Sequence, residues 1–450
     1  MHEDYLSSWS CYLMSDYIFM LESHLTTSQF QLVNAVQAAA AEANVSVFLA
    51  GGAMRDVLGG YPVRDLDFVI EGSPKPLAKF LQKSMNGEII STDDRKKSIE
   101  MLFPGNVTAE FAMAKVEKHG RTGSKPSIVP ATIHEDLKGR DFTINAIALS
   151  LNKASRGLLL DPTNGLADLE RREIHTAYSQ ALYDDPSRIL RMWRFSVRMN
   201  FPLSERTRSQ YENVKDAGLH LKISQEILGP ELMRMAAELN PAELLRILDE
   251  EKILPLFSPA LTGAKVNLAG MQKLIKARTN IPFEIGFSAN DVSLFLFLLT
   301  QKFSPKEKAL LIKNMGIDKA AVAGWQQLEA KSKKLEKEIK SPALKKLSLV
   351  YKTLKDAPGE QLVFLLMNSS ERIVPDRIRN HLQKLVGMAQ EVTDQDVFEA
   401  TKIAPGAPKF AKAKDDFIAK KLDSRPRKLP EPEPEPVPIP GKGGKILARI

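Results

Sequence analysis

Gly51-Gly52-Ala53-Met54-Arg55-Asp56, followed closely by Asp65-Leu66-Asp67-Phe68-Val69-Ile70, is the stretch that decides the fold. The apolar run Val47–Ala50 in front of it predicts a buried strand. The two glycines allow a tight turn and close approach by a ligand. Residues 53–58 then predict a short helix that ends at two further glycines. A strand, a glycine turn and a helix N-terminus in this order direct backbone N–H groups at an anion.

The second part of this stretch predicts a strand that carries two carboxylates. Side chains at positions i and i+2, here Asp65 and Asp67, share one face of a strand and lie about 6.6 Å apart along it. A lone glycine pair is usually only a turn, and a lone Asp-x-Asp is usually a solvated strand edge. Together they indicate more, because two carboxylates beside a phosphate-binding turn are what metal-dependent phosphoryl transfer requires.

Composition gives broader limits. The 450 residues are enough for two to four domains, and 43% hydrophobic with 26% charged residues is ordinary for a soluble globular protein. The formal net charge of +8 favours a polyanionic partner, above all nucleic acid. The alternative is simply a basic cytoplasmic protein.

Cys11 is the single cysteine, so one chain can form neither a disulfide framework nor a cysteine-based zinc site. A reducing, cytoplasmic location is the natural prediction. The first residues lack the pattern of a signal peptide, since Glu3 and Asp4 stand where basic residues are expected. No apolar run is long enough for a membrane span, so we predict no membrane partner.

The pattern along the chain predicts an α+β protein. Residues 29–44 read as an amphipathic helix, and strand-like and helical runs then alternate to about residue 160, which predicts a sheet of about five strands with helices. The strand-like runs are Val47–Ala50, Asp65–Ile70, Glu88–Ile90, Glu100–Phe103, Thr108–Ala112 and Ala146–Leu151. From Asp168 onward strand signals disappear, and the remainder is predicted to be all-α.

Two regions of the second half have unusual compositions. Residues 302–355 are rich in lysine with interleaved glutamates, which fits either a solvated helix face or contact with a nucleic-acid backbone. The repeat Pro430–Pro436, in which proline and glutamate alternate, cannot form a core and predicts a disordered spacer of polyproline II character. A short basic tail follows it.

Three further motifs follow the two aspartates. The first is Arg140-Asp141-Phe142-Thr143-Ile144-Asn145, the second is Asp161-Pro162-Thr163-Asn164-Gly165, and the third runs from Asp184-Asp185-Pro186-Ser187-Arg188 through Arg191 to Arg194. With the glycine–aspartate block, this set resembles the bacterial class II tRNA nucleotidyltransferases (CCA-adding enzymes) and their poly(A) polymerase relatives. The resemblance is strong over residues 45–260 and fades to a general helical likeness by about residue 420.

The resemblance implies a nucleotidyltransferase head of polymerase-β type followed by helical neck, body and tail regions. In this family the enzyme extends the 3′ end of tRNA with C, C and A from CTP and ATP, without a nucleic-acid template. The domains it implies are an N-terminal extension (1–28), a catalytic head (29–165), a nucleotide-selecting neck (166–260), an RNA-binding body and tail (261–422) and a Pro/Glu-rich basic end (423–450).

The resemblance also implies roles in the head. Asp65 and Asp67 would hold two Mg²⁺ ions for two-metal phosphoryl transfer. Glu110 would supply a third carboxylate, or else form only a salt bridge at a strand end. Gly51, Gly52 and Arg55 would cradle the triphosphate.

The motif around Arg140 would contact the nucleotide as well. Arg140 would bind the sugar or a phosphate, while Asp141 and Asn145 would hold the neighbouring backbone or ribose, or form a structural turn. Asp161–Gly165 would be a hinge-like linker, or an ordinary β-turn.

The third motif would read the base. Asp185 would accept the exocyclic amino group that cytosine and adenine share, and Arg188 would donate to the same edge, a contact worth about 1–3 kcal/mol of discrimination. Arg191 and Arg194 continue the row at every third residue. The alternative is an Asp185 that caps a helix whose arginines face solvent.

Departures from the family pattern leave the specificity open between CCA, CC-only, A-only and poly(A) addition. The four positions are Lys115, Gly139, Asp184 and Ile227. A catalytically silent RNA-binding protein is a further alternative, and intact Asp65 and Asp67 argue against it. The sequence does not indicate an oligomeric state.

Overall fold

The computed structural model describes residues 17–118, 127–282 and 285–424. Most of the predicted N-terminal extension (1–16) and the predicted Pro/Glu-rich end (425–450) lie outside the described residues. The chain divides into two compact units, the first made of residues 1–275 and 291–326 and the second of residues 276–290 and 327–450. Within the described residues, no helix combines the length and apolar composition needed to cross a lipid bilayer.

The first unit begins with the predicted domain of strands and helices. Its elements are α2 (Thr27–Glu42), β1 (Ser46–Ala50), α3 (Gly51–Leu58), β2 (Leu66–Glu71), α4 (Lys75–Ser84), β3 (Glu88–Asp93), β4 (Ser98–Phe103), β5 (Val107–Met113), β6 (Lys115–Lys118), β7 (Ser127–Pro130), α5 (Ile133–Lys138), η1 (Thr143–Asn145), β8 (Ala148–Ser150), β9 (Leu159–Leu160) and α6 (Gly165–Arg171). Thr26 and Gln29 form a capping box that begins α2.

One mixed sheet organises this domain. Its strand order is β3-β4-β5-β2-β1-β8-β9, and only the β2–β5 pair is parallel. The sheet has seven strands rather than the predicted five or so, and β6 with β7 forms a separate two-stranded ribbon. The prediction missed β9, β6 and β7 because strands of two to four residues are too short to show a period of two.

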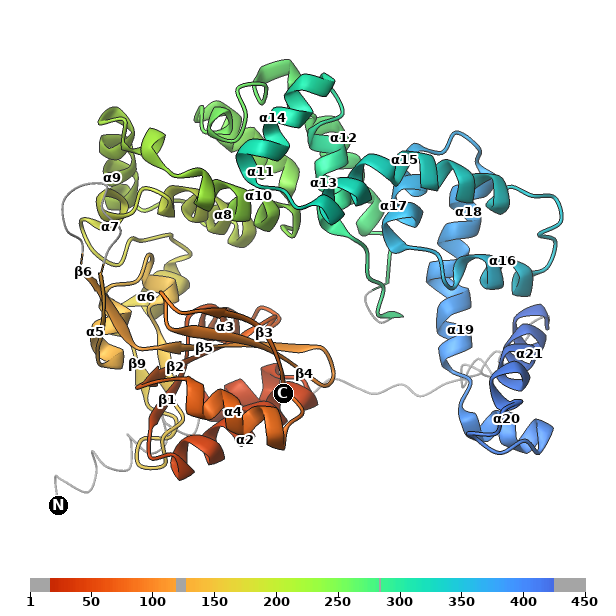
Figure 1. The fold of residues 1–450 in the computed structure, drawn as a ribbon, viewed down its shortest axis with the longest axis horizontal. Helices are drawn as coiled ribbons and strands as arrows, with labels where there is room; N and C mark the ends of the chain where they lie inside the picture. The colour runs from red at the N-terminus through yellow and green to blue at the C-terminus, as the bar shows by residue number, and fades with distance from the viewer. Residues whose placement is uncertain (1–16, 119–126, 283–284, 425–450) are drawn as a thin grey trace, which may run out of the picture. The chain divides into compact units, whose positions relative to one another are not determined.

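Burial on both faces explains why this sheet is stable. On one face Phe48 and Val69, which pair across β1 and β2, pack with Ile133 and Leu137 of α5. On the other face the rings of Phe68 and Phe111 stack with centroids 5.1 Å apart. Figure 1 shows α2 and α4 together on one side of the sheet and α3 on the other. Because side chains alternate along a strand, Asp67 shares the face of Val69.

The rest of the first unit is helical, as predicted. Its elements are α7 (Ala181–Asp184), α8 (Arg188–Met199), α9 (Glu205–Asp216), η2 (Leu219–Lys222), α10 (Gln225–Ala236), α11 (Pro241–Glu250), η3 (Leu254–Leu256), η4 (Gly263–Lys265), α12 (Leu268–Arg278), α13 (Asp291–Leu299), α14 (Pro305–Met315) and α15 (Lys319–Ile339), of which α12 and α15 continue into the second unit. Helix α10 packs on α13 and α14. A Cβ on Gly229 would lie 2.2 Å from the Met315 carbonyl oxygen, so only glycine permits this approach.

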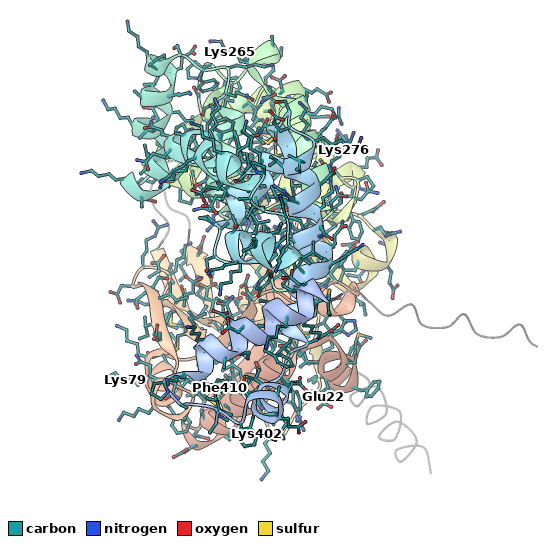
Figure 2. All side chains as sticks on the ribbon, turned by 90° about the vertical axis from the view of Figure 1, so that its right-hand side faces the viewer. Glu22, Lys79, Lys265, Lys276, Lys402 and Phe410 are labelled. Atoms are coloured by element: carbon teal, nitrogen blue, oxygen red, sulfur yellow. The ribbon has the colours of Figure 1, made fainter. Side chains whose placement is uncertain are left out.

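The second unit is also helical. Its further elements are α16 (Leu347–Leu354), α17 (Gly359–Asn368), α18 (Ile373–Asn380), the π-helical turn η6 (His381–Leu385), α19 (Val386–Gln390), α20 (Asp394–Thr401) and α21 (Phe410–Asp423). Helix α21 packs on α16, α19 and α20. In the side view of Figure 2, Lys402 after α20 and Phe410 at the start of α21 lie near one another.

Candidate active site

The predicted glycine turn lies against the predicted acidic strand. Gly51 has a positive φ of 66°, and a Cβ there would be 2.9 Å from Arg140 Nη1. The Gly52 N–H donates a 2.9 Å hydrogen bond to Asp67 Oδ2. A Cβ on Gly52 would lie 3.0 Å from that same oxygen. The backbone conformation of Gly51 therefore favours glycine, and a side chain at Gly52 would crowd the Asp67 carboxylate, which the N-terminus of α3 faces.

Carboxylates from three adjacent strands form a row beside this turn. Asp67 on β2 pairs in register with Glu110 on β5, and Glu110 pairs in turn with Glu100 on β4. Asp65 lies just before β2 and accepts a hydrogen bond from the Thr108 hydroxyl. The structure thus brings together the three acids that were predicted. It adds Glu100, which could be found only from the strand register.

The pKa of Asp67 reflects this crowding. Burial raises it to about 6, the negative charges of Glu110 and Asp65 act in the same direction, and Arg140 opposes them. Like charges on directly opposed strand positions repel one another. A divalent cation would relieve this repulsion, so the donor set fits Mg²⁺, which prefers carboxylate oxygens.

A different trio has the closest grouping of possible metal ligands among the described residues. Single ligand atoms of Asp168, Glu173 and His175 all lie within 4.8 Å of one another. Asp168 already accepts a 2.8 Å hydrogen bond from the Thr143 hydroxyl and lies 3.5 Å from the Arg171 guanidinium. This trio lies on α6 and in the segment just after it, and contains none of the predicted site residues.

Arg55 does not point into open space. The side chain is 3% exposed, and its Nε and Nη2 donate to Asp56 while Nη1 donates to Asn145 Oδ1 at 2.8 Å. Its guanidinium also lies 5.0 Å from the centre of the Phe195 ring. Direct contact of Arg55 with a triphosphate stays a prediction, and in this structure it holds Asn145 in place.

The Arg140 motif joins the head to α8. Arg140 donates from Nε to Asp136 at 2.9 Å and from Nη1 to the Asn145 carbonyl at 3.1 Å. Asp141 accepts from the Asn145 amide at 3.1 Å and lies 2.7 Å from Arg191 Nη2. Burial alone would raise the pKa of Asp141, but Arg191 and Arg188 hold it below its ordinary value. Asp141 and Asn145 are therefore bound into the scaffold.

The second motif acts as a cap. The Asp161 carboxylate accepts the N–H groups of Gly165 at 2.7 Å and Leu166 at 2.9 Å, at the start of α6. A Cβ on Gly165 would lie 2.1 Å from the Thr143 carbonyl oxygen. The segment is a tight turn in the structure, and its predicted role as a hinge stays untested.

Asp185 and Arg188 lie close together, as predicted. Arg188 Nε is 3.8 Å from Asp185 Oδ2, and its guanidinium donates to the carbonyls of Gly139 and Arg140 and to the Tyr178 hydroxyl. Asp185 precedes α8, and its Oδ1 accepts the Ser187 N–H and hydroxyl. The N-cap of α8 is therefore Ser187, whereas the alternative interpretation placed the cap at Asp185.

Arg191 and Arg194 are held by carboxylates. Arg191 pairs with Asp141, and the buried Arg194 lies 3.4 Å from Glu231 and 3.2 Å from Glu238. The guanidiniums of both, together with those of Arg55 and Arg198, lie 5.0–5.7 Å from the Phe195 ring centre. The spacing in the sequence did not reveal these partners, which are far along the chain.

Comparison with known proteins agrees with this geometry. Residues 47–175 match the family described as the poly A polymerase head domain. The A-adding tRNA nucleotidyltransferase of Aquifex aeolicus is 29% identical over 342 residues, which make up 75% of this chain and 40% of that protein. The CC-adding tRNA nucleotidyltransferase of Deinococcus radiodurans is 33% identical over 201 residues, or 45% of this chain and 52% of that protein.

Residues 47–175 are thus similar to the poly A polymerase head domain, and the chain is similar to tRNA nucleotidyltransferases over a larger part of its length. It spans only about half, or less, of the length of these two relatives. A solved structure described as CCA-adding enzyme apo form II covers 91% of this chain with a TM-score of 0.54 and 22% identity, which shows a shared fold. The predicted α+β class, with a nucleotidyltransferase head and an all-α remainder, is thereby confirmed.

Proposed function

We propose that this chain is a template-independent tRNA nucleotidyltransferase that adds C and/or A to the tRNA 3′ end from CTP and ATP. The observation that carries the proposal is the contact of the Gly51-Gly52 turn with Asp67, in a row of carboxylates that continues to Glu110. The match of the head to a polymerase family supports the same chemistry.

Asp65 and Asp67 would hold Mg²⁺, with Glu110 as a third carboxylate. Two Mg²⁺ ions held by these carboxylates would supply activation of the RNA 3′-hydroxyl and charge stabilisation of the leaving pyrophosphate. The chain itself contributes positioning: the absence of side chains at Gly51 and Gly52 lets a triphosphate approach the backbone, and Arg140 beside them offers a cation. Asp67 must lose its proton to serve as a ligand, which its raised pKa opposes below about pH 6.

Asp185 and Arg188 would select the base. Arg188 is anchored on the carbonyls of Gly139 and Arg140, next to the motif that flanks the glycine turn. Asp185, whose side chain is 38% exposed, can accept the exocyclic amino group of cytosine or adenine. Uracil and guanine carry an oxo group at that position and would leave the carboxylate unsatisfied.

The helical remainder would bind the tRNA. A net charge of +8 favours a polyanion, and the predicted RNA-binding region, residues 261–422, includes the lysine-rich run. A cytoplasmic location stays a prediction.

Nucleotide incubation tests the proposal. Transcripts of one tRNA that end before CCA, after C, after CC and after CCA would each be incubated with CTP, ATP, UTP or GTP singly, and with CTP and ATP together. We expect addition that stops at CCA, with no use of UTP or GTP. Long A tracts on unrelated RNA would identify a poly(A) polymerase instead, and no incorporation with any substrate would contradict the proposal.

Addition of A alone is a second candidate. The relative whose match extends over 75% of this chain is named an A-adding enzyme. Under this alternative, ATP alone would complete the transcript ending in CC, whereas CTP would not extend the transcript that ends before CCA.

A further inference from the structure

A groove opens between α16 and α18 in the second unit, with a volume of about 520 Å³. We call it the α16–α18 groove; both helices are labelled in Figure 1. Its lining is Leu344, Lys345, Lys346, Leu347, Val350, Arg372, Ile373, Asp376, Arg377 and Asn380. Leu347 and Ile373 are 43% and 45% exposed, so the groove presents apolar side chains to whatever enters it.

The same groove carries an excess of positive charge. Of the ten lining residues, Lys345, Lys346, Arg372 and Arg377 are cationic, and Asp376 alone is anionic. The Arg372 side chain is 95% exposed and lies 3.6 Å from Asp376. Arg377 donates to three backbone carbonyls, among them Leu344 at 2.7 Å, so hydrogen bonds fix its guanidinium at the groove without neutralising its charge.

The described chain ends beside this groove. Asp423, the last residue of α21, accepts the Ser348 N–H at 3.0 Å and the Ser348 hydroxyl at 2.7 Å. Ser348 follows directly on Leu347, which lines the groove. Five residues separate Ser424 from Pro430. The six residue-to-residue steps between them could span roughly 19 Å if extended. The Pro/Glu repeat thus begins within reach of the groove.

The repeat complements the groove in chemistry. Residues 430–436 alternate proline with Glu431, Glu433 and Glu435. In the polyproline II conformation that this sequence predicts, there are three residues per turn. Because glutamate recurs at every second residue, each face of such a helix shows both a proline ring and a carboxylate. Whichever face of the repeat enters the groove, its proline can contact the aliphatic side chains of the groove while its glutamate contacts the cations.

We propose that residues 430–436 dock in the α16–α18 groove of their own chain. The tether raises the local concentration of the repeat to the millimolar range, so even weak contacts fill the groove. A docked repeat places its carboxylates on cations that an RNA phosphate would otherwise contact. This last consequence rests on the proposed function, whereas docking itself does not.

Zero-length carbodiimide cross-linking of the full chain tests docking without RNA. We expect amide bonds from Glu431, Glu433 or Glu435 to Lys345 or Lys346, mapped by mass spectrometry, and few to the exposed Lys412 on α21. Equal labelling of Lys412 would overturn the proposal. So would links found chiefly between copies, which a mixture of isotopically labelled and unlabelled protein detects.

Peptide binding gives a second test. A fluorescent peptide of residues 428–441 should bind a chain that ends at residue 424, and should bind the full chain at least tenfold more weakly, because the tethered repeat competes. Replacing its three glutamates by glutamine, or introducing Lys345→Glu with Arg372→Glu in the protein, should weaken binding at least tenfold. Lys412→Glu is the matched control and should change nothing. Equal binding by the glutamine peptide would overturn the proposal.

The consequence for RNA has a separate readout. The chain that ends at residue 424 should bind tRNA several-fold more tightly than the full chain at low salt, and Lys345→Glu should remove that difference. If neither form binds tRNA or transfers nucleotides, the proposed function fails while the cross-links still report docking. If both bind tRNA equally although the cross-links form, only the masking consequence is overturned.

Discussion

The acidic row of the head and the arginine-bearing helix α8 lie in the same unit but differ in how their charges are balanced. Asp67, Glu110 and Glu100 stand on neighbouring strands, and the pKa of Asp67 is raised by burial and by the other acids around it. On α8, Arg191 and Arg194 are each matched to carboxylates of the scaffold. The acids repel one another, whereas the arginines are neutralised.

This difference separates two kinds of charged motif. A cluster that keeps uncompensated charge after folding has a reason to bind a ligand of opposite sign. An arginine already paired with buried carboxylates contributes to the fold, and can reach a nucleotide only by giving up those partners. We therefore expect changes in the acidic row to affect chemistry, and changes at Arg194 to affect stability.

The largest expected effect is loss of nucleotide transfer in Asp67→Asn. In the proposed mechanism the substitution removes a charge that would hold Mg²⁺, whose stabilisation of the reacting phosphate is worth several kcal/mol, so the rate should fall about 10³-fold or more. Transfer would be measured with radiolabelled nucleotide, and tRNA affinity by filter binding should stay within about twofold of that of the unmodified protein.

Two further variants accompany this test, one at the second aspartate and one as a control. Asp65→Ala should lose transfer and retain tRNA binding in the same way. Asp94→Asn, which changes a carboxylate that is 77% exposed, is the matched control and should be fully active. An active Asp67→Asn protein would contradict this contrast. The acidic row would then contribute only to the fold, as Arg191 and Arg194 do.

The next effect concerns the arginine side. Arg194→Met leaves Glu231 and Glu238 buried with one cation fewer, and should lower the free energy of unfolding by about 3 kcal/mol. Urea unfolding measures this, and adding Glu231→Gln to the same protein should recover part of the loss. Arg246→Ala, which breaks exposed pairs with Glu243 and Glu250, is the control and should change stability by at most about 1 kcal/mol. Full stability with selective loss of CTP or ATP use would instead place Arg194 at the nucleotide.

Local sequence was enough to predict most of the acidic site. Gly51, Gly52, Asp65 and Asp67 lie close together in the chain, and strand periodicity alone assigns both aspartates to one face. Glu110 required a guess that its strand is a neighbour, which the parallel β2–β5 pair bears out. Glu100 could not be predicted, because only the register of β4 against β5 brings it into the row.

The arginine side was less predictable for a physical reason. Spacing placed three arginines on one helix, but their partners come from far along the chain: Gly139 is 49 residues from Arg188, and Glu238 is 44 residues from Arg194. No local pattern encodes which carboxylate a buried guanidinium will meet. Likewise, no sequence pattern singled out Phe195, around which four guanidiniums gather.

The raised pKa of Asp67 should also make the stability of the protein depend on pH. The native protein keeps a proton on Asp67 up to about pH 6, whereas the unfolded chain loses it near 3.8. Between these values the native state binds more protons, so stability falls as the pH rises through this window. In EDTA, Asp67→Asn should therefore be more stable than the unmodified protein by up to about 3 kcal/mol at pH 7.5, and by about half as much at pH 5.

Urea unfolding at the two pH values checks this. Added Mg²⁺ should stabilise the unmodified protein at pH 7.5 and leave Asp67→Asn unchanged. The same stability difference at pH 5 and pH 7.5 would mean that Asp67 is ionised across this range.

The smallest expected effect is on base preference, and it concerns Arg188, which connects α8 to the Gly139–Arg140 segment of the head. Its guanidinium is bound to the carbonyls of Gly139 and Arg140, and its Nε lies 3.8 Å from Asp185, the carboxylate that we propose reads the base. Arg188→Ala should reduce the preference for CTP and ATP over UTP and GTP about tenfold, since one polar base contact is worth about 1–3 kcal/mol. Single-turnover rates with each nucleotide measure this, and Arg188→Lys should restore less than half of the lost preference because it lacks the planar fork. An equal loss for all four nucleotides would assign Arg188 to the scaffold, with Arg191 and Arg194, and would leave Asp185 alone to discriminate between bases.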